Sequence, residues 1–228
     1  MLLEIIALSA ADARNAEAGG ADRVELVADM AVGGLSPAPA TVAAVRAAAA
    51  IPVRVMLRTT PDFAADPPAL RRAARDLRAA GAEAFVLGFL TPAGAVDRAA
   101  LDAVLPHLDG APWTFHRAID AARDRAAAWR ALEGLPHLDA VLTAGSPDGL
   151  TAGLPTLIAE ASGGTVNILA GGGLRERHLS PLAASGVTAF HSGSAVRPGG
   201  DWSAPVDPAR VRRLRARLDG SVGRIHIL

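Results

Sequence analysis

Acidic, basic and imidazole side chains interrupt several short apolar segments of this sequence. The side chains that could carry chemistry are Glu4, Glu25, Arg54, Arg58, His116 and His191. A carboxylate beside a histidine can move protons, and an arginine can hold a carboxylate or phosphate group. The same histidines and carboxylates could offer nitrogen and oxygen ligands to a divalent metal ion. We therefore expect either proton-transfer catalysis or metal binding.

Glycine-rich turns follow the seventh and the eighth apolar segments. In such turns backbone N–H groups often bind phosphate, because no side chain blocks the approach of the anion. The alternative is that these glycines only form tight turns. We expect anion binding, by the following set: Arg58, Gly172, Gly173, His191, Ser192, Gly193 and Ser194.

The catalytic candidates are Glu4, Glu25 and His116. For the two glutamates a structural role stays open, because buried carboxylates and guanidinium groups can also pair in an ion-pair layer with Arg54. For Arg54 itself the structural role is favoured, since it lies early in its segment. Arg58 lies at the segment's end, where a ligand would be met.

Apolar segments rich in β-branched residues alternate with alanine-rich amphipathic segments. Strands are predicted at residues 2–8, 23–28, 53–58, 84–89, 112–117, 140–144, 166–170 and 188–192. Helices are predicted at residues 11–18, 39–49, 68–80, 97–105, 124–132, 154–161, 176–184 and 208–218. Eight strand–helix units over 228 residues predict one TIM-like (β/α)₈ barrel domain, residues 1–228. A doubly wound sheet is the competing topology, but the first strand lacks its glycine-rich turn.

The barrel would bring the polar strand residues together. Thr114 and His116 share a face of the fifth strand, and Thr143, Asn167 and His191 fall late in the last three strands. If all of them face the lumen, they converge near the carboxyl ends of the strands, where such barrels keep their sites. Two longer loops, residues 58–63 and 197–208, could cover this mouth.

Composition excludes several classes of function. The chain has no cysteine, tyrosine or lysine, so thiol nucleophiles, disulfides and Schiff-base lysines are absent. A net charge of zero gives no bulk attraction to nucleic acid. No apolar run is long enough to cross a membrane, and no secretion signal is evident, so a cytoplasmic protein is expected. The apolar tail, residues 225–228, could pack on the barrel floor or form a homo-oligomer contact.

Several segments resemble the CutC family. They are Gly-Ala-Asp-Arg-Val-Glu-Leu at 20–26, Gly-Gly-Leu-Ser-Pro at 33–37, Thr-Phe-His-Arg-Ala-Ile-Asp at 114–120, Leu-Thr-Ala-Gly at 142–145, and His-Ser at 191–192. They occur in the same order from the first strand to the eighth. The resemblance implies a cytoplasmic TIM-like barrel with a role in copper homeostasis, and copper as the bound metal.

This chain departs from the family where family members commonly have cysteine. Ile6 and Ala7 stand in the first strand, and Val27 follows Glu25-Leu26 in the second. Cu(I) prefers thiolate and thioether ligands, and Met56 is the methionine within a predicted strand. We therefore predict that Cu(I) buffering is not the main activity. The alternatives are an isomerase or lyase acting on a small anionic or phosphorylated metabolite, and a non-catalytic small-molecule sensor.

Overall fold

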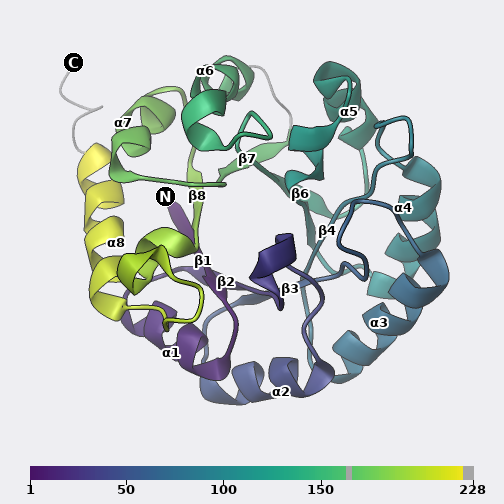
Figure 1. Cartoon of the computed structure of the whole chain (residues 1–228), viewed down its shortest axis with the longest axis horizontal. Helices are drawn as coiled ribbons and strands as arrows, with labels where there is room; N and C mark the ends of the chain where they lie inside the picture. Colours follow the sequence, from purple (N-terminus) through teal and green to yellow (C-terminus); the bar gives the residue numbers. More distant parts are fainter. Residues whose placement is uncertain (163–165, 223–228) are drawn as a thin grey trace.

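The computed structural model describes residues 1–162 and 166–222. Within these residues, eight parallel strands close into a barrel in the order of the chain, and helices surround it (Figure 1). The strands are β1 (Leu2–Ala7), β2 (Arg23–Leu26), β3 (Val53–Met56), β4 (Phe85–Leu87), β5 (Trp113–Phe115), β6 (Leu138–Thr143), β7 (Asn167–Ala170) and β8 (Ala189–Ser192). The predicted TIM-like barrel is confirmed.

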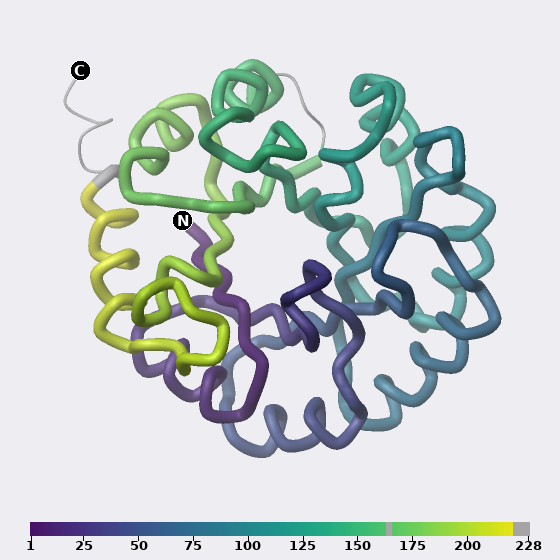
Figure 2. The backbone as a smooth tube through the Cα atoms, viewed as in Figure 1, coloured from purple at the N-terminus to yellow at the C-terminus, as the bar shows by residue number. Residues whose placement is uncertain are grey.

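The surrounding helices follow the strands one by one. They are α1 (Ala10–Ala18), α2 (Pro39–Ala48), α3 (Pro67–Ala79), α4 (Arg98–Val104), α5 (Arg125–Leu132), α6 (Leu150–Ala161), α7 (Glu176–Ala184) and α8 (Pro208–Val222). The tube in Figure 2 shows the ring closing where α8 lies beside α1, and the two helices are in contact. In the described residues no helix is both long and apolar enough to cross a membrane.

Two helix boundaries differ from the sequence prediction by four residues, whereas the other helix boundaries agree within one residue. Helix α6 begins at Leu150, four residues before the predicted start, and carries Pro155 inside it. The missing N–H of a proline costs little near a helix start, so Pro155 was a misleading start signal. Helix α8 continues through Gly220 to Val222, beyond the predicted stop. The apolar tail, residues 225–228, lies outside the described residues.

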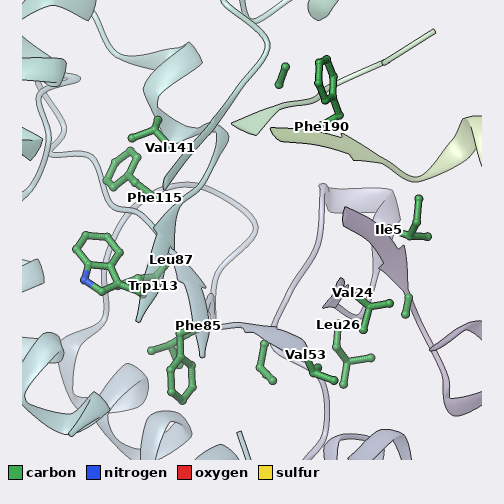
Figure 3. Close-up of a cluster of buried hydrophobic side chains, with 14 of the residues drawn as sticks. Ile5, Val24, Leu26, Val53, Phe85, Leu87, Trp113, Phe115, Val141 and Phe190 are labelled. Atoms are coloured by element: carbon green, nitrogen blue, oxygen red, sulfur yellow. The ribbon is translucent and has the colours of Figure 1, made fainter. Parts of the chain in front are cut away.

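Alternation along the strands separates two environments. One set of side chains, including Ile5, Val24, Phe115 and Phe190, points outward and packs beneath the helices, as Figure 3 shows. The neighbouring positions point into the barrel, where Ile6, Val27, Met56 and Val86 form a small apolar cluster of their own. Burial of the outward-facing set drives the strand–helix packing.

The lower lumen is closed by an ion pair that spans the barrel. Arg54 of β3 donates to Thr114 Oγ1 of β5 at 3.0 Å and forms a salt bridge with Asp139 of β6. The pairing register shifts between Trp113 and Thr114, so Asp139 has no β5 residue opposite it. The structural role predicted for Arg54 agrees with this geometry, but its carboxylate partner is Asp139 and not Glu4 or Glu25.

Two polar strand residues do not reach the mouth of the lumen. Thr143 points outward, where its hydroxyl contacts Arg125 of α5 and Asp120. Its neighbour Leu142 faces the lumen instead, as strand alternation requires. Asn167 begins β7 and is exposed, so it lies at the opposite end of the barrel. The expectation that both would converge at the mouth was wrong.

Candidate functional site

A cavity of about 500 Å³ opens at the carboxyl ends of the strands. Most of the predicted site residues line it: Glu25, Arg58, His116, Gly172, Gly173, His191, Ser192, Gly193 and Ser194. A short helical turn, η1 (Met30–Val32), contributes to the wall and is the dark purple turn over the middle of the barrel in Figure 1. The apolar part of the lining includes Met56, Phe63 and Trp202.

Glu4 lies beneath this cavity and is not part of its lining. Its Oε1 is 2.8 Å from Nδ1 of His191, and its Oε2 accepts a hydrogen bond from Nε of Arg23 at 2.5 Å. Burial alone would raise the pKa of Glu4, but the His191 hydrogen bond and the Arg23 charge outweigh it and lower the pKa to about 2. Glu4 is therefore a charged, fully engaged support for His191.

Glu25 is almost fully buried and poorly satisfied. Its Oε2 lies 3.7 Å from Nε2 of His191, and its Oε1 has no hydrogen-bond partner in the described part of the chain. Burial and the charge of Glu4 raise the pKa of Glu25, the charge of His191 opposes the rise, and the resulting pKa is about 7. A carboxyl group with this pKa exchanges its proton near neutral pH, which suits an acid–base catalyst.

His191 connects the two glutamates. Burial would lower its pKa, but the hydrogen bond to Glu4 and the charges of Glu25 and Glu4 raise it. Nδ1 is oriented by Glu4 and Nε2 faces Glu25. Glu25 and His191 are close enough to influence each other's charge, so the two groups titrate as a pair.

His116 presents a neutral imidazole to the cavity. Its Nδ1 accepts the backbone N–H of Ala118 at 3.2 Å, so the ring proton is on Nε2. Burial, together with the nearby charge of Arg58, lowers the pKa of His116 to about 3. Nε2 is buried without a partner in the described residues. The Phe63 ring lies 5.4 Å from the imidazole, centroid to centroid, and covers it. The Nε2–H group of His116 can therefore donate a hydrogen bond to a ligand.

Arg58 was predicted to bind an anion directly, but most of the hydrogen bonds of its guanidinium group go to backbone carbonyl oxygens. Its guanidinium donates to the carbonyl oxygens of Val32, Gly34, Asp62 and Pro61, which clamps the loops after β2 and β3 together. The guanidinium also lies 4.9 Å from the centre of the Phe63 ring. In this geometry Arg58 acts on the cavity mainly through its charge.

The loop after β8 is fastened over the cavity by a buried ion pair that sequence reasoning missed. Arg197 is 1 % exposed, and its Nη2 lies 2.8 Å from Oδ2 of Asp12 in α1. The Trp202 ring lies 5.2 Å from this guanidinium and packs against Gly193, where a Cβ would come within 2.3 Å of the indole. Trp202 thus shields the cavity and covers one of the predicted anion-binding glycines.

Arg117 and Asp120 also line the cavity and were missed as site residues. They belong to the Thr-Phe-His-Arg-Ala-Ile-Asp segment, which was the available signal. Asp120 accepts hydrogen bonds from Arg117, Arg125 and Thr143, and from backbone N–H groups of the β6 loop. This network fixes the turn after β5 on the end of β6.

The side chains present do not fit a copper centre. In residues 1–162 and 166–222 no group of three histidine, aspartate or glutamate side chains is placed to hold a metal ion. Where thiolates would face the lumen, Ile6 and Val27 pack against Met56 and Val86. Aliphatic groups at these positions offer Cu(I) no ligand.

Comparison with known proteins gives consistent relatives. The family model described as "CutC family" matches residues 1–196. The human "Copper homeostasis protein cutC homolog" is 35% identical over 207 residues, covering 87% of this chain and 76% of that protein. A CutC family protein of Porphyromonas gingivalis strain W83 is 37% identical, covering 84% of this chain and 80% of its own. The crystal structure of CutC from Streptococcus agalactiae is similar with a TM-score of 0.75 at 24% identity, covering 85% of this chain and 98% of that one.

Proposed function

The chain belongs to the CutC family, and from this premise we propose that its cavity catalyses proton transfer in a small anionic compound that carries a carbonyl group. The observation that carries the proposal is Glu25, a buried carboxyl group in the cavity lining, with a pKa of about 7 and one oxygen that has no hydrogen-bond partner among the described residues. Groups with strongly shifted pKa values gather at catalytic sites.

Glu25 is the proposed general base. Its unpartnered Oε1 takes a proton from a carbon next to the substrate's carbonyl group. His191 faces the other oxygen of Glu25, and Glu4 fixes the orientation of His191 from below. Glu4, first considered as a catalytic residue, is therefore assigned as a positioning residue, because both of its oxygens are occupied by protein groups.

His116 is the proposed electrophile. A neutral imidazole whose Nε2–H has no protein partner can donate a hydrogen bond to the carbonyl oxygen, where negative charge develops as the proton leaves. Because the pKa of His116 is lowered to about 3, the imidazole stays neutral at physiological pH. Neutral imidazoles polarise carbonyl groups in this way in other barrel enzymes.

Where the carbon that loses the proton carries a hydroxyl group, Glu25 returns the proton to the carbonyl carbon, and the hydroxyl proton passes by way of His116 to the former carbonyl oxygen, which gives isomerisation. Alternatively, a leaving group on the carbon beyond departs with its bonding electron pair as a C=C bond forms, and Glu25 keeps the proton until release, which gives elimination. Both reactions need one base and one hydrogen-bond donor. Neither needs the lysine, cysteine or tyrosine that the chain lacks.

The experiment begins with a thermal-shift screen of small anionic carbonyl compounds, followed by assays for isomerisation and elimination on each hit. Glu25→Gln should lower turnover by about 10²- to 10⁴-fold, because the base is lost, while the ligand still binds. Glu133→Gln, which alters an exposed carboxylate after α5, is the matched control and should leave turnover unchanged. Full turnover by Glu25→Gln would exclude Glu25 as the base.

A copper role is what the names of the relatives suggest, and a sensor role is the non-catalytic alternative. We propose that this chain does not buffer Cu(I), because cysteine is absent and Ile6 and Val27 fill the lumen beside Met56. Anaerobic calorimetric titration with Cu(I) tests this, and tight binding at one ion per chain would refute it. A ligand that binds tightly and is never converted would favour the sensor. The cytoplasmic location stays a prediction.

A further inference from the structure

Arg117, two residues after β5, has a guanidinium that the protein uses only in part. Nε donates to Oδ2 of Asp120 at 2.8 Å, and Nη2 donates to the carbonyl oxygens of Ser146 and Pro147 at 3.2 and 3.4 Å. Nη1 makes no hydrogen bond within residues 1–162 and 166–222. The side chain lines the cavity and is 36% exposed, so Nη1 is available to a ligand there.

The loop after β7 places a backbone donor beside this guanidinium. At Gly172 a Cβ would come within 2.9 Å of Cζ and Nε of Arg117, so the guanidinium lies directly against the glycine. The carbonyl oxygen of Gly172 accepts the N–H of Leu150 at the start of α6, at 2.8 Å. In a planar trans peptide the next N–H, that of Gly173, points the opposite way and so away from α6.

The Gly173 N–H has no acceptor among the described residues. Gly173 lines the cavity, has a φ of 92°, and has open space where a side chain would begin. A ligand oxygen can therefore approach this N–H closely. The corresponding glycine after β8, Gly193, is instead in contact with Trp202.

The charge of the cavity also favours an anion. Four other arginines with little exposure each have a carboxylate within 3.0 Å: the pairs are Arg23–Glu4, Arg54–Asp139, Arg125–Asp120 and Arg197–Asp12. Arg58 has four carbonyl oxygens but no carboxylate within 4.0 Å in the described part of the chain. Only the more distant carboxylate of Asp62 adds a favourable charge interaction in the described residues, so a ligand anion in the low-dielectric mouth would gain from this positive charge.

We propose that Nη1 of Arg117 and the N–H of Gly173 bind the carboxylate or phosphate group of the ligand. The anion then lies at the β5–β7 side of the mouth and not in the loop after β8. This inference deepens the proposed function and rests on it for the reacting end of the ligand, which meets Glu25 and His116. The substrate class that fits is a carbonyl compound with a terminal carboxylate or phosphate group.

The test is an NMR titration of ¹⁵N-labelled protein with sodium phosphate, repeated with sodium acetate and with sodium chloride at equal ionic strength. We expect the amide signal of Gly173 to shift to saturation with phosphate, acetate or both, and not with chloride. Which of the two binds more tightly identifies the anionic group. Arg117→Gln should weaken binding about tenfold or more, because a charge-assisted hydrogen bond is lost.

Arg130→Gln removes the same charge from the exposed face of α5 and should bind the anion as the wild type does. Arg117→Lys keeps the charge without the forked geometry and should give an intermediate affinity, which covers the case in which Arg117→Gln folds poorly. Saturable shifts centred on Gly193 and Ser194, unchanged affinity in Arg117→Gln, or no saturable shift with phosphate or acetate would overturn the proposal. Glu25→Gln should bind the anion normally, so loss of catalysis and loss of the anion site are separate results.

Discussion

Two buried carboxyl groups at the mouth of the barrel, Asp120 and Glu25, differ in the number of hydrogen bonds that they receive from the protein. Asp120 receives five hydrogen bonds from Arg117, Arg125, Thr143 and two backbone N–H groups, at 2.6–3.2 Å. Glu25 has one oxygen without any partner in the described residues and the other 3.7 Å from His191. Both side chains lie within the same cavity lining.

This difference in hydrogen bonding distinguishes a carboxylate with a structural role from one that can act on a ligand. A carboxylate with all its acceptor positions filled stabilises the groups around it and has nothing left for a ligand. Burial without hydrogen-bond partners disfavours the charged form of a carboxyl group, and groups whose pKa is shifted in this way gather at functional sites. This contrast agrees with a structural role for Asp120 and with the proton-transfer role proposed for Glu25.

The largest stability effect is expected at Asp120. Asp120→Asn leaves Arg117 without its carboxylate and replaces one acceptor oxygen by an NH2 donor that faces N–H donors, so the free energy of unfolding should fall by about 3 kcal/mol. Denaturant unfolding measures the change. Asp148→Asn, an exposed position in the same β6 loop, is the control and should change stability little. A loss under about 1 kcal/mol at Asp120 would remove the contrast with Glu25.

A smaller effect of opposite sign is expected at Glu25. The folded pKa of about 7 lies above the ordinary glutamate value of 4.5, so the folded state holds an extra proton between these values. The stability from the uncharged form is complete below pH 4.5 and is lost as the pH rises through about 7. Glu25→Gln cannot ionise, so it should gain about 2 kcal/mol relative to wild type between about pH 5 and pH 8.5.

Unfolding curves of wild type and Glu25→Gln at both pH values measure this gain. Glu133→Gln again serves as the exposed control, with no expected dependence of the difference on pH. A Glu25→Gln variant that loses stability equally at both pH values would mean that Glu25 is a structural group like Asp120.

The smallest effect is expected at Thr143. Thr143→Val removes the hydroxyl 2.6 Å from Oδ1 of Asp120, while four of the five hydrogen bonds remain. The hydroxyl also accepts from Arg125 and from the Gly145 N–H, but both donors keep another acceptor, so stability should fall by about 1 kcal/mol, the typical net contribution of one hydrogen bond. Turnover should not change, because Thr143 does not line the cavity. A larger loss, near that of Asp120→Asn, would show that the network depends on this hydroxyl alone.

The barrel was predictable because its signals are local and repeat along the chain. Eight alternating strand and helix patterns, each bounded by turn residues, leave few architectures that bury every apolar face. Glu25, His116 and His191 were identified for a related reason, since a polar residue inside a buried strand is conspicuous. The start of α6 was missed because Pro155 imitates a helix start.

Partnerships across the barrel could not be predicted from spacing. Arg54 pairs with Asp139 eighty-five residues away, and Arg197 with Asp12 at a separation of 185 residues. For each arginine the sequence contains several carboxylates that could be its partner. Only the pairing register and the path of the loops bring one of them within reach.

The sequence by itself determined the fold class, the family and which strand residues are polar, because these follow from local pattern and residue type. The tertiary structure decided which of those residues have their hydrogen bonds filled. Arg58 donates to loop carbonyls and Glu4 pairs with Arg23 and His191, whereas one oxygen of Glu25 has no partner in the part of the chain that the structure describes. Hydrogen-bond satisfaction depends on distances between segments remote in the chain, and those distances exist only after the barrel has closed.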